Sequence, residues 1–212
     1  MKSIPTEGLR NIVFDLGNVL ISYDPHKFHL SEGTTESQTS RYISDIYESE
    51  EWQMLDRGTI CLQDAIDSIA SKSTLSAEET ASVFEMRNRL LFPLTDNTKL
   101  LKPLKKAGYR LFYLTNFPED MFSLLSKTHR VFSLFEGGVV SSHVKLLKPE
   151  AAIYTHLTDK HGIEPSESLF IDDLQRNIDG AARLGFETLH LPDHRKLKQK
   201  LQSLFPSVFS GA

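Results

Sequence analysis

Five short apolar runs alternate with segments of helical periodicity along most of this chain. The runs cover residues 11–16, 110–116, 137–142, 168–173 and 186–190, and glycine, proline or polar residues bound them. Nearly continuous hydrophobicity predicts strands that are buried on both faces, as in a parallel sheet covered by helices. Single helical segments separate the last four runs, which predicts right-handed crossovers and an α/β fold.

The segment between the first two runs has a different pattern. Residues 26–91 show helical periodicity and almost no strand signal, and residues 76–79 form a capping box. Four apolar residues spaced as i, i+3, i+4 and i+7 predict one buried helix face: Leu62, Ala65, Ile66 and Ile69. We expect a sheet-containing core from residues 1–25 and 92–212, with a small helical cap at 26–91 inserted after the first strand.

Local signals also predict where several connections and helices begin. Pro25 removes a backbone donor, so residues 21–26 are predicted to form a loop, and the polar residues 31–40 a loose connection or helix start. Thr95 or Asp96 is expected to cap the next helix.

Polar residues follow the ends of four predicted strands. Parallel strands place their carboxyl ends along one edge of the sheet, where α/β proteins bind ligands. Asp15, the pair Thr115 and Asn116, Lys148, and the pair Asp172 and Asp173 all fall at or after such ends. Taken singly, these residues also suit a turn cap, a strand end or a surface lysine. Two adjacent acids after an apolar strand are costly without a partner, so the set predicts a shared site.

The chemistry of this set favours a metal and a phosphoryl group. Carboxylates held close together repel one another unless a cation joins them, and Mg²⁺ prefers such oxygen ligands. Lys148 adds a positive charge and Thr115 a hydrogen-bond donor, both suited to phosphoryl oxygens. We therefore expect Asp15 to attack phosphorus and form an aspartyl phosphate that water hydrolyses.

Composition excludes several other functions. The 212 residues carry a net charge of −4, with 40% hydrophobic and 25% charged residues, as in an ordinary globular protein. The basic run at 195–200 has helical spacing and predicts a solvated helix face, so we expect no nucleic-acid partner. One cysteine excludes an internal disulfide and a cysteine metal cluster. No apolar stretch approaches a membrane span, and we expect a cytoplasmic protein.

Four motifs in order resemble those of the haloacid dehalogenase superfamily of hydrolases. They lie at residues 14–20 (Phe-Asp-Leu-Gly-Asn-Val-Leu), 113–116 (Tyr-Leu-Thr-Asn), 148–150 (Lys-Pro-Glu) and 170–173 (Phe-Ile-Asp-Asp). The resemblance covers about residues 10–190 and implies a Rossmann-like parallel sheet core with a small α-helical cap. Trp52 and residues 55–60 resemble a cap pattern of the subgroup that contains bacterial glucose-1-phosphate phosphatases.

The resemblance also implies a role for each motif residue. Asp15 resembles the family's nucleophile, Thr115 and Asn116 its phosphoryl-binding residues, and Lys148 the lysine that neutralises the nucleophile and phosphate. The family's Mg²⁺ ligands correspond here to Asp15, the backbone carbonyl of Gly17, and Asp173. Asp172 corresponds either to a further ligand or to a neighbour of one. Asn177 lies one turn further, where the family often has a second acid.

Gly17 departs from the usual pattern of the family's phosphatases, which have a general acid and base at this position. General acid–base help is typically worth about 10²–10⁴-fold in rate.

Three hypotheses follow: a phosphatase of small phosphorylated metabolites such as sugar phosphates, a 2-haloacid dehalogenase, or a non-catalytic binding or regulatory protein. Asp24 or His26 could replace the missing general acid, but an exposed loop pair is the favoured interpretation of both residues. Arg57 and Trp52 are candidate cap residues that face the site, although the cap core is the favoured place of Trp52. We expect a monomer or homodimer.

Overall fold

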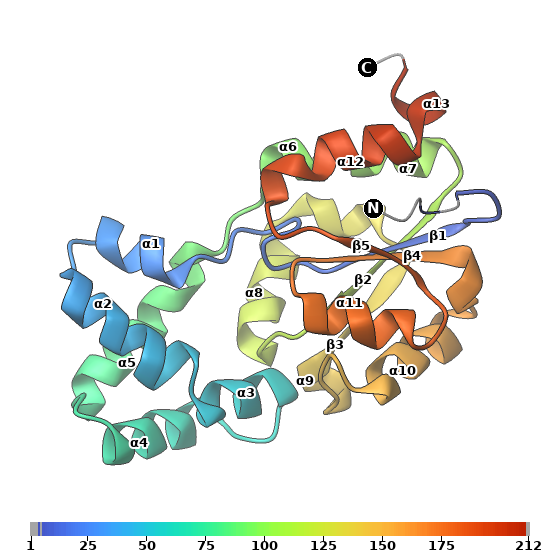
Figure 1. The fold of residues 1–212 in the computed structure, drawn as a ribbon. Coiled ribbons are helices and arrows are strands. Elements are labelled where there is room, and N and C mark those ends of the chain that lie inside the picture. The colour runs from blue at the N-terminus through green and yellow to red at the C-terminus, as the bar shows by residue number, and fades with distance from the viewer. Residues whose placement is uncertain (1–3, 5, 211–212) are drawn as a thin grey trace.

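The five strands form a single parallel sheet in the computed structural model, which describes residues 4 and 6–210 (Figure 1). The outermost residues of the predicted core, 1–3, 5, 211 and 212, lie outside the described part. The sheet has the order β3-β2-β1-β4-β5. Its strands are β1 (Asn11–Phe14), β2 (Arg110–Thr115), β3 (Gly137–Val140), β4 (Ser168–Asp172) and β5 (Glu187–His190). The predicted α/β class and parallel sheet are confirmed.

The central position of β1 in the sheet explains why the strand is buried throughout and apolar after Asn11. Val13 pairs in register with Phe112 of β2 and with Phe170 of β4, and these three residues belong to one hydrophobic cluster. Ile12 and Phe14 point the other way and belong to a second cluster. Alternate side chains of a strand point to opposite faces, so both faces of this sheet are packed.

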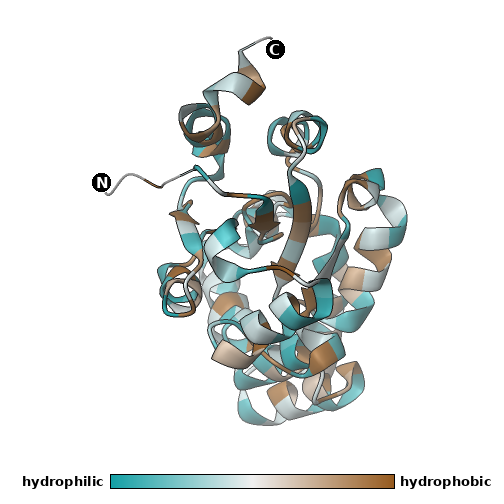
Figure 2. Cartoon of the chain, turned by 90° about the vertical axis from the view of Figure 1, so that its right-hand side faces the viewer, coloured by the Kyte–Doolittle hydropathy of each residue, from teal (hydrophilic) through white to brown (hydrophobic). Residues whose placement is uncertain are grey.

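Helices cover the two faces of the sheet. On one face, α10 (Ala151–His161) and α11 (Gln175–Ala182) contribute residues to the cluster that contains Val13. On the other face pack α7 (Leu101–Lys106), α8 (Glu119–Thr128) and α12 (Leu197–Leu204). Figure 2 shows hydrophobic positions in brown on the strands, and brown alternating with teal around the helices. The short helices α6 (Thr95–Thr98), α9 (Ser141–Val144) and α13 (Pro206–Phe209) complete this part.

Helices also fill the chain between β1 and β2, and they lie beside the sheet in Figure 1. They are α1 (Pro25–Ser31), α2 (Glu36–Tyr42), α3 (Glu50–Arg57), α4 (Leu62–Lys72) and α5 (Ala77–Met86), with a π-helical turn at Ile43–Tyr47 and a 3₁₀ turn at Arg87–Leu90. Trp52 of α3 stacks on Phe84 of α5 with ring centroids 5.7 Å apart. We call this segment the cap; its predicted limits at residues 26 and 91 stay a prediction.

Two of the predicted connections and helix starts were wrong. Residues 24–26 begin a helix rather than form a loop, because the Asp24 carboxylate accepts a bond from the Lys27 N–H and Pro25 occupies the first helical position. The prediction of a loose connection or helix start at residues 31–40 is confirmed, because residues 32–35 connect α1 to α2 and Thr35 caps α2. Neither Thr95 nor Asp96 caps α6, which begins after Leu94 without a side-chain cap.

One close contact attaches the end of α3 to the core. Gly58 ends α3 with φ +74°, and a Cβ there would lie 2.5 Å from the Ser142 carbonyl oxygen of α9. Ser141 Oγ donates to the carbonyl oxygen of Asp56, and Arg57 forms an ion pair with Glu150. These contacts fix the last turn of α3 against the sheet-containing part.

None of the helices in the described part of the chain combines the length and apolar character needed to cross a membrane.

We predict that Gly58→Ala weakens the fold more than a matched glycine substitution. Gly108 also has positive φ (+96°), but a Cβ there meets nothing within 4 Å. Gly108→Ala should lower the free energy of unfolding by about 1 kcal/mol through backbone strain alone. Gly58→Ala should lower it by about 3 kcal/mol, because steric overlap with Ser142 is added. Urea unfolding measures both, and equal losses would contradict the close contact.

Candidate active site

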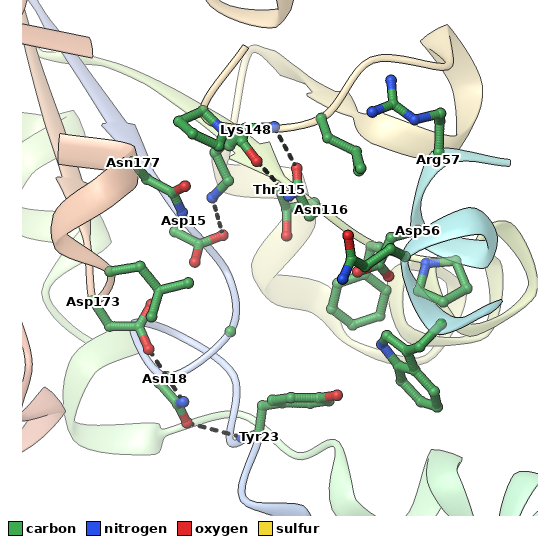
Figure 3. Close-up of a pocket in the computed structure, with 18 of the residues that line it drawn as sticks. Asp15, Asn18, Tyr23, Asp56, Arg57, Thr115, Asn116, Lys148, Asp173 and Asn177 are labelled. Carbon is green, nitrogen blue, oxygen red and sulfur yellow. Dashed lines mark hydrogen bonds and ion pairs between the residues drawn. The ribbon is translucent and has the colours of Figure 1, made fainter. Parts of the chain in front are cut away.

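A cavity of about 750 Å³ lies at the carboxyl edge of the sheet, between the strand ends and α3 of the cap. Asp15 follows β1, Thr115 ends β2, Lys148 precedes α10 and Asp173 follows β4, and all four line this cavity (Figure 3). The structure therefore brings together the strand ends that the sequence predicted to converge.

Lys148 lies at the centre of the charged residues. Its Nζ is 2.8 Å from Asp15 Oδ1 and 2.6 Å from Asp172 Oδ2, and only 4% of the residue is exposed. Burial lowers the pKa of Lys148, but attraction to Asp15 and Asp172 outweighs burial and leaves this pKa above its ordinary value. Lys148 is therefore a fixed positive charge beside the predicted nucleophile.

Asp172 binds Lys148 but does not itself line the cavity. It is fully buried, and its carboxylate accepts bonds from the Leu174 N–H at 2.8 Å and from Asn177 Nδ2 at 2.9 and 3.0 Å, besides the bond from Lys148. These donors engage both carboxylate oxygens of Asp172. The predicted role of Asp172 as a metal ligand stays a prediction; its observed contacts position Lys148.

Asp15 is held in a site that disfavours its charge. Burial is the main cause; Lys148 opposes it, while Asp172 and Asp173 repel the charge, and together these raise the pKa of Asp15 to about 7. Burial, followed by repulsion from Asp172, also raises the pKa of Asp173. Three carboxylates with one lysine leave excess negative charge at this point.

A divalent cation fits this donor set. Asp15, Asp172 and Asp173 each offer a carboxylate oxygen within 4.8 Å of the others. Asp15, Gly17 and Asp173 line the cavity. Hard oxygen ligands of this kind suit Mg²⁺, which takes one or two carboxylates and keeps several waters. Asp15, Gly17 and Asp173 are thus grouped as a cation site requires, and the predicted ligand set stays a prediction.

Asn116 holds the backbone of Lys148. Its Oδ1 accepts from the Lys148 N–H at 2.9 Å, and its Nδ2 donates to the Lys148 carbonyl oxygen at 3.1 Å. The side chain of Asn116 thus positions the lysine, and its predicted contact with phosphoryl oxygens stays a prediction. Thr115 is buried and lines the cavity wall, and its predicted contact with phosphoryl oxygens also stays a prediction.

Sequence reasoning assigned no function to two residues of this site. Asn18 has φ 52°, which asparagine tolerates better than most residues, and its Nδ2 donates to Asp173 Oδ2 at 3.2 Å. The available sequence signal was its place directly after Gly17, at the boundary of the first apolar run. Asp56 of the cap also lines the cavity. Its only sequence signal was its position within the motif at residues 55–60. A local sequence pattern does not show which side of a helix faces a distant strand end.

The proposed substitute acids were wrong. The Asp24 carboxylate caps α1, and His26 pairs with Glu36 at 2.8 Å on the exposed surface of the cap. Of the two candidate cap residues, Trp52 is mostly buried in the cap core but contributes to the cavity wall. Arg57 also lines the cavity, where its guanidinium is bound to Glu150.

Fold and site together define a hydrolase with an aspartate at its centre, and comparison with known families gives the same class. Residues 9–185 match the model of the haloacid dehalogenase-like hydrolases. The chain belongs to this family, as its motifs suggested.

Similar proteins within the family include phosphatases and dehalogenases. The chain is 29% identical over 193 residues to a sesquiterpene phosphatase, astK, of Aspergillus oryzae, covering 91% of this chain and 94% of that protein. It is 27% identical over 96 residues to (S)-2-haloacid dehalogenase 4A of Burkholderia cepacia, covering 45% and 42% of the two chains. A HAD family enzyme of Bacteroides thetaiotaomicron, solved in complex with magnesium and inorganic phosphate, has a TM-score of 0.67 and 25% identity, covering 86% of this chain and 93% of that one.

We predict that Mg²⁺ stabilises the protein through this cluster of acids. Adding Mg²⁺ at about 100 times its Kd to EDTA-treated protein should add about 2.7 kcal/mol to the free energy of unfolding, and so raise Tm by roughly 5 °C or more. Asp173→Asn should remove most of this increase, because a cavity-facing carboxylate is lost. Asp179→Asn is the matched control, since Asp179 is exposed on α11. An equal Tm increase in both variants would contradict the site.

Proposed function

We propose that this protein is a Mg²⁺-dependent phosphatase that hydrolyses a small organic phosphate monoester through an aspartyl phosphate on Asp15. One observation supports this most directly: Lys148 binds the carboxylate of Asp15 at 2.8 Å on the wall of a cavity that Thr115 and Asp173 also line. A nucleophile, a fixed cation, a hydroxyl donor and a metal-binding acid are the parts that phosphoryl transfer to a carboxylate requires.

Each residue has a definite task in this proposal. The Asp15 carboxylate attacks phosphorus, Lys148 neutralises charge on the attacking carboxylate and the phosphoryl oxygens, and Thr115 donates a hydrogen bond to one of those oxygens. Mg²⁺ bound by Asp15, Asp173 and the Gly17 carbonyl would keep both acids ionised and offset the charge of the phosphoryl group. Water then hydrolyses the acyl phosphate and restores Asp15.

Two observations bear on the substrate. The motif pattern at Gly17 and residues 55–60 resembles that of glucose-1-phosphate phosphatases and favours a sugar phosphate. The cavity wall, however, carries three aromatic side chains from the loop after β1 and from the cap, namely Tyr23, Tyr47 and Trp52. They suit the apolar part of an alcohol, and the likeness to a sesquiterpene phosphatase points the same way. We therefore include phosphates of both kinds in the test below.

A 2-haloacid dehalogenase is the second candidate, favoured by the partial likeness to the Burkholderia cepacia enzyme. Its family branch resembles Asp-x-Tyr-Gly-Thr in the first motif, whereas this chain has Asp15-Leu-Gly-Asn-Val. The excess negative charge from Asp172 and Asp173 also favours a metal-dependent reaction. A non-catalytic role is the third candidate. Cytoplasmic location and a monomeric or dimeric state stay predictions.

We predict phosphate release from at least one member of a panel comprising p-nitrophenyl phosphate, glucose 1-phosphate and farnesyl phosphate. Release should require Mg²⁺, stop with EDTA, and fall by at least about 10³-fold in Asp15→Asn, which lacks a nucleophile. Asp179→Asn serves again as the exposed control. Chloride release from 2-chloropropionate without metal would instead support the dehalogenase, and no release from any compound would support the non-catalytic role.

A further inference from the structure

An alcohol leaves a phosphate ester readily only when its oxygen receives a proton. The residues next to Asp15 are poorly suited to supply one. Lys148 is bound to two carboxylates and its pKa is raised, and the acids of the predicted metal site must stay ionised to hold a cation. Position 17 carries no side chain, although a Cβ there would meet only Tyr23 Cβ, at 3.9 Å. This position is therefore vacant rather than sterically blocked.

Asp56 of the cap places a carboxyl group on the side of the cavity opposite Asp15. In Figure 3, Asp15 lies on one side of the pocket, and Asp56 projects from α3 on the other, with Thr115 and Asn116 between them. Attack by Asp15 on phosphorus pushes the leaving oxygen away from the nucleophile. The leaving oxygen therefore faces the side from which Asp56 projects.

The position of Asp56 is fixed by contacts that hold the cap on the core. Ser141 Oγ donates to the carbonyl oxygen of Asp56, and the same Oγ accepts from the Phe117 N–H at 2.9 Å, directly after Thr115 and Asn116. Gly58 permits the close approach to Ser142 described above. These contacts hold Asp56 beside the end of β2, where Thr115 lies.

Charged and titratable groups around Asp56 leave it able to hold a proton near neutral pH. Burial is the main cause; Lys148 opposes it and Asp15 adds to it, and together they raise the pKa of Asp56 to about 7. The adjacent Arg57 is bound to Glu150, and the pKa of Tyr23, across the cavity, is raised well above its ordinary value.

We propose that Asp56 is the general acid and then the general base of this site, in place of a side chain at position 17. The inference rests on the proposed phosphatase activity. In the first step an Asp15 oxygen bonds to phosphorus, the bond from phosphorus to the leaving oxygen breaks, and that oxygen takes the proton of Asp56. In the second step water attacks phosphorus and gives a proton to the Asp56 carboxylate. The bond from phosphorus to Asp15 breaks, which releases inorganic phosphate.

Two aryl phosphates of nearly the same shape test this role. Phenolate is a much poorer leaving group than p-nitrophenolate, so phenyl phosphate depends more on a proton donor. With Mg²⁺ in excess, Asp56→Asn should lower kcat/KM for phenyl phosphate by about 10²-fold or more, but for p-nitrophenyl phosphate by less than about 10-fold. Asp67→Asn, an exposed acid of α4, is the matched control and should leave both values unchanged.

The pH profile gives a second measurement. For the unaltered protein, kcat/KM for phenyl phosphate should fall as pH rises above about 7, because Asp56 loses the proton that it must donate. This decline should be absent in Asp56→Asn. Thermal unfolding of both variants checks that the fold is retained.

The outcomes separate the two proposals. If the unaltered protein releases phosphate from neither aryl phosphate nor any other member of the panel above, the phosphatase proposal fails. If it hydrolyses them and Asp56→Asn lowers both values equally, or neither, the phosphatase proposal stands and the role of Asp56 is overturned. A selective loss on phenyl phosphate together with the lost decline above pH 7 supports Asp56 as the proton donor.

Discussion

The buried contact of Lys148 with two carboxylates is the interaction on which the site depends. It joins the end of β1 at Asp15 to the end of β4 at Asp172, from a loop that the amide of Asn116 holds against β2. Buried charges are tolerated only when they are paired and hydrogen-bonded, and removing one partner of such a pair typically costs about 3–5 kcal/mol. Three segments far apart in sequence are therefore held in one arrangement by the same charge.

The same arrangement leaves part of the negative charge of the three carboxylates uncompensated. Lys148 neutralises part of the charge of Asp15, Asp172 and Asp173, yet the pKa of Asp15 remains raised to about 7. Carboxylates in such an environment are stabilised by a bound cation, which is the reason that the proposed function includes Mg²⁺. Asn18 and Asn177 bind the adjacent acids Asp173 and Asp172. Contacts within the protein, rather than contacts with a ligand, therefore offset the repulsion between these two acids.

In the proposed mechanism the cap contributes a proton donor as well as part of the cavity wall. Its α3 ends against α9 through Gly58, Ser141 and the ion pair of Arg57 with Glu150, and these contacts bring Asp56 and Trp52 to the cavity. A segment that both closes the cavity and carries the proposed proton donor couples exclusion of water to assembly of the site. The leaving group would then meet its proton donor only when the cap is docked on the core.

The sequence by itself determined the strands and the convergence of Asp15, Thr115, Lys148 and Asp173. Continuous apolar runs and the polarity of parallel strands are local and repetitive signals, and they require no knowledge of distant contacts. Helix starts in the cap were less predictable, since Asp24 and Pro25 suit a loop and a helix start equally. Only the tertiary structure decided the place of Asp56. Its position depends on contact with Ser141, 85 residues further along the chain, and no local pattern encodes how one helix end docks on another segment.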